Sequence, residues 1–120
     1  MWAIVEQPVP KVAQADVDRI MHRDYRTDAD QANTVLRAYG DKPWHREPER
    51  VMLACLKLAG GSLVRLREQI EVAKKDFRDV VAQAEYPRFC SEAFLTKLPP
   101  DVTRQIIESD WKQYQDWLTG

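Results

Sequence analysis

Apolar side chains return every three or four residues along most of this chain, the spacing that places them on one face of an α-helix. Proline and glycine interrupt the periodic stretches, where they end one helix and let the next begin. Only the stretch from Trp2 to Val5 has a strand-like pattern. The pattern predicts an all-α protein with five main helices, over about residues 13–24, 28–39, 49–59, 63–85 and 100–118.

The helix expected over residues 63–85 has the most regular pattern in the chain. Its apolar positions alternate in spacing between three and four residues, and Tyr86 and Pro87 follow its end. We therefore expect one unbroken helix with a single buried stripe. The stripe consists of Leu63, Leu66, Ile70, Ala73, Phe77, Val80 and Ala84.

The preceding helix, over residues 49–59, is apolar on nearly all sides, as expected of a helix at the centre of a bundle. Gly60 and Gly61 allow a tight turn after it, and the Ser62 hydroxyl can cap the helix that follows. The two helices should therefore form an antiparallel hairpin. The predicted fold is an all-α bundle of about five helices built around this central antiparallel helical hairpin.

Three stretches of this hairpin resemble a segment shared by a group of short, uncharacterised bacterial proteins. They are residues 49–61, 66–68 and 73–81, within a segment of about residues 49–87. The resemblance implies a helical hairpin and a bacterial cytoplasmic setting. It implies no activity, so no residue takes a role from it.

Composition and charge predict an ordinary globular domain. The 120 residues include 44% hydrophobic ones, enough for a single core, and we expect one domain over residues 1–120. Pro8 and Pro10 favour an extended arm over residues 1–12. The 18 basic and 19 acidic residues nearly cancel, which argues against an acidic tail or a polyanion-binding chain.

The sequence also predicts a cytoplasmic protein. The first residues lack the basic and apolar regions of a signal peptide. The longest apolar run, Val51 to Ala59, is less than half of a bilayer span, so no membrane partner is expected. The two cysteines, Cys55 and Cys90, lie far apart and are expected to be reduced.

Nucleic acid is disfavoured as a partner. Residues 63–85 carry five basic and five acidic side chains, and a neutral helix cannot supply the release of counterions that drives DNA binding. A phosphate contact would have to use the flank formed by Arg67, Lys74 and Arg78. We interpret this flank as a solvated helix face with paired charges.

Candidate polar residues support one alternative hypothesis, a small-molecule or enzymatic site near helix 63–85. No nucleophile motif, phosphate-binding loop or complete set of metal ligands occurs, so we predict no catalytic residue, metal or cofactor. A thiol activated by the neighbouring Arg88 is conceivable only at Cys90. The first residues to test for a polar site are Asp76, Arg78, Asp79, His22 and His45.

Aromatic residues support the leading hypothesis. Trp111, Tyr114 and Trp117 are spaced by three residues in the last helix, and Trp44 lies in a loop bounded by prolines. Large aromatic side chains either close a small core or bind a partner. We predict a non-enzymatic cytoplasmic interaction or adaptor protein that binds a protein partner or a second copy of itself through these four residues.

Overall fold

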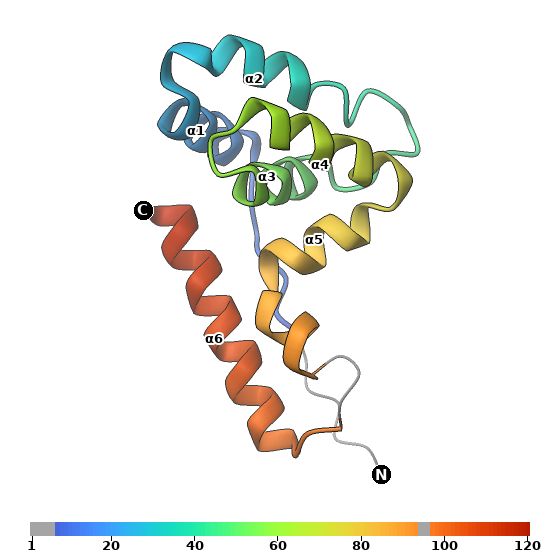
Figure 1. Cartoon of the computed structure of the whole chain (residues 1–120), viewed down its shortest axis with the longest axis vertical. Helices are drawn as coiled ribbons and strands as arrows, with labels where there is room; N and C mark the ends of the chain where they lie inside the picture. Colours follow the sequence, from blue (N-terminus) through green and yellow to red (C-terminus); the bar gives the residue numbers. More distant parts are fainter. Residues whose placement is uncertain (1–6, 94–96) are drawn as a thin grey trace.

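The chain folds into α-helices, as Figure 1 shows for the computed structural model, which describes residues 7–93 and 97–120. A 3₁₀ turn at Arg26–Asp28 and a π-helical turn at Phe89–Ala93 complete the helical structure of these residues. The all-α prediction is confirmed, while the strand-like stretch from Trp2 to Val5 lies outside the described residues. The helices are α1 (Gln14–Tyr25), α2 (Ala29–Leu36), α3 (Pro48–Ala59), α4 (Leu63–Lys75), α5 (Phe77–Glu85) and α6 (Pro100–Thr119).

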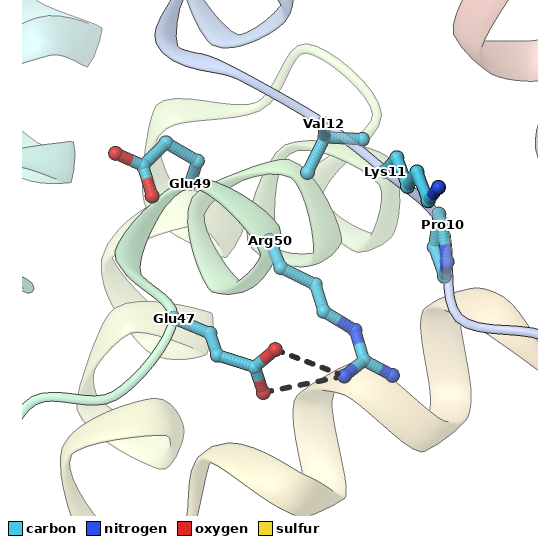
Figure 2. A pocket seen from close by; sticks show the side chains of 6 residues that line it. All are labelled: Pro10, Lys11, Val12, Glu47, Glu49 and Arg50. Atoms are coloured by element: carbon cyan, nitrogen blue, oxygen red, sulfur yellow. Dashed lines mark hydrogen bonds and ion pairs between the residues drawn. The ribbon is translucent and has the colours of Figure 1, made fainter.

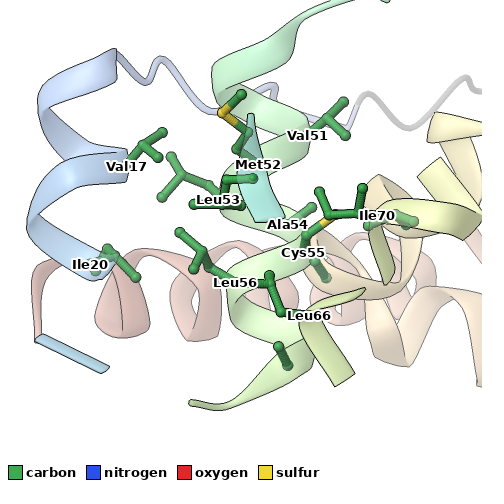
Figure 3. Close-up of a cluster of buried hydrophobic side chains, with 14 of the residues drawn as sticks. Val17, Ile20, Val51, Met52, Leu53, Ala54, Cys55, Leu56, Leu66 and Ile70 are labelled. Carbon is green, nitrogen blue, oxygen red and sulfur yellow. The ribbon is translucent and has the colours of Figure 1, made fainter. Parts of the chain in front are cut away.

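Helix α3 lies at the centre of the core, as its apolar composition predicts. It packs against α1, α4 and α5, and its side chains from Val51 to Leu56 are all buried. Figure 3 shows these side chains between Val17 and Ile20 of α1 and Leu66 and Ile70 of α4. Pro48 starts the helix, where its missing N–H group costs no hydrogen bond.

The expectation of one helix over residues 63–85 is wrong, because the chain breaks at Asp76. Its backbone is extended, with φ −153° and ψ 101°, and its carboxylate accepts a hydrogen bond from the Arg78 N–H at 3.1 Å. Aspartate favours this N-cap position over a helix interior. The predicted stripe is nevertheless buried or half-buried on both α4 and α5. The hairpin is not confirmed in the predicted form, since its second arm is two helices.

Helix α6 runs beside α5 and the π-helical turn, apart from α2 and α4 (Figure 1). Asp110 is fully buried, and its carboxylate accepts hydrogen bonds from the N–H groups of Arg88 at 3.1 Å and Phe89 at 2.9 Å. The Gln113 amide donates to the carbonyl of Glu85 at 3.3 Å, near the end of α5. These polar contacts fix α6 against the chain that precedes it.

Two arginines of α1 hold the other end of α6. Arg19 donates to the Leu118 carbonyl at 2.6 Å, and Arg23 donates to the Trp117 carbonyl at 2.7 Å. Cations at a helix C-terminus satisfy its free carbonyls and interact favourably with the helix dipole.

None of the helices within the described residues has both the length and the hydropathy needed to cross a membrane.

Candidate functional site

The loop between α2 and α3, residues 37–47, is the candidate interaction site, and we call it the Trp44 loop. The His45 ring stacks on the Tyr39 ring, with centroids 4.6 Å apart and planes 10° apart. His45 Nδ1 accepts a hydrogen bond from the Gly40 N–H at 2.9 Å, which assigns the ring proton to Nε2 in the neutral form. The Asp41 carboxylate lies 3.4 Å from the same nitrogen and pairs with it only when the ring is charged.

Further contacts tie the ends of the Trp44 loop to the core. Tyr39 is buried, and its hydroxyl donates to the Arg46 carbonyl at 2.9 Å. Gly40 has a φ of +92°, and a Cβ there would lie 3.0 Å from the Pro48 side chain. A larger residue at position 40 would therefore strain the loop. These contacts hold the loop that carries Trp44 in a defined conformation.

Trp44 itself projects from this loop into solvent. Its exposed fraction is 72%, the highest among the large apolar residues that are exposed in the described chain. Lys42 and Arg46 stand two residues to either side, and their side chains form no hydrogen bond or ion pair within the described residues. The loop therefore exposes one indole and, two positions before and after it in the sequence, two cationic side chains that are unpaired within the described residues.

The aromatic residues of α6 are placed differently. Tyr114 is buried, and its ring lies 5.4 Å from the ring of Trp117. The Arg23 guanidinium lies 5.5 Å from the centroid of the Trp117 ring, a cation–π contact that covers part of that side chain. Trp111 and Trp117 are half-buried. Of the four predicted contact residues, Tyr114 closes the core and Trp44 is the one that is largely exposed.

The five residues predicted for a polar site do not come together. His22 is exposed on α1, with Nδ1 2.7 Å from the Asp18 carbonyl oxygen, while His45 is stacked in the Trp44 loop. Asp76 and Arg78 pair with each other at the start of α5, at 3.0 Å, and Asp79 lies one position further along that helix. Within the described residues, no hydrogen bond or ion pair joins these three places, and no group of three potential metal ligands occurs.

The pair of Asp76 and Arg78 predicts an acid-sensitive helix start. Hydrogen bonds from the Arg78 side chain and N–H favour the charged carboxylate and hold the pKa of Asp76 below its usual range. Because the pKa is lower in the folded state, this stabilisation is present above the unfolded pKa of about 4 and is lost as pH falls through the folded value.

Carbon NMR titration of the Asp76 carboxyl group measures this directly. We expect a midpoint below that of an unfolded aspartate, and an upward shift in Arg78→Gln. Arg67→Gln, on the exposed surface of α4, is the control and should leave the midpoint unchanged. A wild-type midpoint at or above the ordinary value would contradict the pairing.

Sequence reasoning missed one buried ion pair. Arg50 donates through Nε and Nη2 to the two carboxylate oxygens of Glu85, each at 2.7 Å, and through Nη1 to Glu47 at 3.2 Å. A shallow hollow of about 310 Å³ opens beside it, lined by Pro10, Lys11, Val12, Glu47, Glu49 and Arg50 (Figure 2). Because carboxylates of the chain already engage Arg50, the Arg50 cluster holds α3 to α5, and its guanidinium is not free to bind a ligand in the hollow.

A second hollow, of about 370 Å³, lies between α3, α4 and α5. Its walls are mainly apolar, and Asp79 is its one charged lining residue. Val72, in its lining, is 38% exposed. The lining residues are Leu58, Gln69, Val72, Asp79, Val80 and Gln83, so Asp79 is the one predicted polar residue that lines either of these two hollows.

The cysteines show no sign of activation. Burial raises the pKa of the Cys55 thiol to about 12. Burial also raises the pKa of Cys90, and the nearby Asp110 carboxylate adds to the shift. The Arg88 side chain, the one neighbour considered as an activator of Cys90, is engaged by Glu92 at 2.7 Å.

Comparisons of the chain with protein-family models, with curated proteins and with solved structures found no match.

Proposed function

We propose that this chain is a small non-enzymatic interaction or adaptor protein that binds a protein partner, with Trp44 as its anchor residue. The observation that supports the proposal is a 72% exposed tryptophan on a loop whose base is buried and hydrogen-bonded. Tryptophan is among the residues that contribute most to binding energy at protein interfaces. Within the loop the Trp44 ring makes one edge contact, with the His45 ring at a centroid distance of 6.0 Å, and most of the indole stays in water.

The order of the Trp44 loop supports the same proposal. Stacking of His45 on Tyr39 and the hydrogen bond from Tyr39 to Arg46 fix the loop before any partner arrives. A fixed loop loses less conformational entropy on binding than a flexible one. Lys42 and Arg46 beside the indole favour a partner pocket with apolar walls and acidic groups at its rim.

A bacterial cytoplasmic setting completes the proposal. It is supported by the resemblance of residues 49–87 to short bacterial proteins and by the two cysteines, which are both free thiols. The small-molecule alternative has less support, because its candidate residues lie at three separate places.

Replacing Trp44 by alanine is expected to abolish partner binding without loss of stability. Because the side chain is mostly exposed, the free energy of unfolding should change by less than about 0.5 kcal/mol. Loss of an anchor tryptophan should raise the Kd for a partner at least about 30-fold. The test is affinity capture after cross-linking in the cells that encode the protein.

Val64→Ala is the matched control, since Val64 is 63% exposed on α4 and lies away from the Trp44 loop. We expect wild type and Val64→Ala to retain the same cross-linked proteins and Trp44→Ala to lose them. Equal recovery from all three variants would rule out Trp44 as the anchor.

A further inference from the structure

We propose that a second copy of this chain binds the Trp44 loop, and that the indole of each copy occupies the hollow between α3, α4 and α5 of the other. The inference rests on the proposed function, since Trp44 is the anchor in both. It adds the identity of one partner and the surface that receives the indole.

The hollow fits an indole in size and in chemistry. Its volume of about 370 Å³ lies at the small end of the range for pockets that hold ring-containing ligands. Leu58, Val72 and Val80 supply apolar walls, one from each of the three helices. A buried indole N–H needs an acceptor, and the lining includes Gln69 and Gln83, whose side chains carry a carbonyl oxygen that can accept this hydrogen bond.

The charges around the two surfaces are complementary. Lys42 and Arg46 are exposed residues of the Trp44 loop, two positions before and after Trp44 in the sequence, and neither side chain is paired within the described residues. Asp79 is the charged residue of the hollow. Its carboxylate interacts electrostatically with the neighbouring Arg78 guanidinium but forms no hydrogen bond or ion pair within the described residues. An exposed carboxylate at the hollow and two cations beside the indole favour this pairing and set its orientation.

Symmetry makes the contact reciprocal. In a two-fold dimer the Trp44 indole of each copy occupies the hollow between α3, α4 and α5 of the other copy, so the same contact forms twice. A single tryptophan in a hollow buries far less than the roughly 1,200 Å² that a stable specific interface needs. Two such contacts still make a small interface, so we expect a weak dimer whose population rises with concentration.

Sedimentation equilibrium across the micromolar to millimolar range tests the proposal. We expect the wild type to dimerise, and both Trp44→Ala and Val72→Arg to raise the dimer Kd at least about 30-fold. Val64→Arg is the control, because it adds the same charge to α4 at a 63% exposed position outside the hollow. It should dimerise like the wild type. Asp79→Lys, on an exposed site, provides a second test of the hollow and should also weaken the dimer.

A wild type that stays monomeric throughout would overturn the proposal. A dimer Kd for Trp44→Ala or Asp79→Lys equal to that of the wild type would also overturn it. So would an equal increase of the dimer Kd in Val64→Arg and Val72→Arg. Circular dichroism shows whether each variant is folded. If Val72→Arg is unfolded, Asp79→Lys alone tests the hollow. The wild type can be monomeric in sedimentation while it cross-links in cells to proteins that Trp44→Ala does not capture. That result rejects self-association and leaves the proposed function standing.

Discussion

Arg50→Ala is expected to destabilise the protein by about 3–5 kcal/mol, because it leaves the Glu85 carboxylate buried without its partner. The Glu85 side chain is only 2% exposed, and both of its oxygens accept hydrogen bonds from Arg50 at 2.7 Å. Urea unfolding at neutral pH gives the free energy of unfolding.

A double variant separates loss of the ion pair from loss of packing. Arg50→Met combined with Glu85→Leu removes both charges and keeps much of the volume, so we expect it to recover most of the loss. Lys112→Ala is the control, because its ion pair with Asp116 is exposed and should contribute little. An Arg50→Ala protein as stable as Lys112→Ala would show that the buried pair does not hold α3 to α5.

Asp110→Ala is expected to cost about 2–4 kcal/mol and to loosen α6. The variant leaves the N–H groups of Arg88 and Phe89 without their acceptor in a region where Asp110 is fully buried. Hydrogen exchange at those two amides should accelerate together with the loss measured by unfolding. Asp110→Asn keeps one acceptor oxygen and should lose less.

Asp116→Ala, at an exposed position of the same helix, serves as the control for helix propensity. If Asp110→Ala and Asp116→Ala unfold at the same urea concentration, the buried carboxylate is not what attaches α6 to the π-helical turn.

Helical periodicity predicted most of the fold but not the break between α4 and α5. The helices expected over 49–59 and 100–118 match α3 and α6, because each combines a strong apolar pattern with a proline at its start. In residues 63–85 the apolar spacing continues unchanged through the break. The signal was Asp76, whose side chain competes with the helical backbone for hydrogen bonds, and the spacing alone concealed it.

The site was predictable only in part. A tryptophan in a proline-bounded loop pointed to Trp44, but the stacking that orders the loop depends on the distance between Tyr39 and His45 in space. Arg50 and Glu85 are 35 residues apart, and their pairing depends on tertiary packing. The sequence does place Glu85 next to Ala84, an apolar position of its helix, which indicates a buried charge that needs a partner. A pattern within one helix cannot name the partner.

Photo-cross-linking at position 44 shows whether the Trp44 loop binds a protein. Trp44 is replaced by a photoreactive phenylalanine analogue, which keeps an aromatic ring at the position, and Val64 receives the same analogue as the control. Irradiation in the cells that encode the protein should give discrete protein adducts at position 44, among them a second copy of the chain, and none at position 64. Adduct yields at position 44 no higher than those at position 64 would contradict the account.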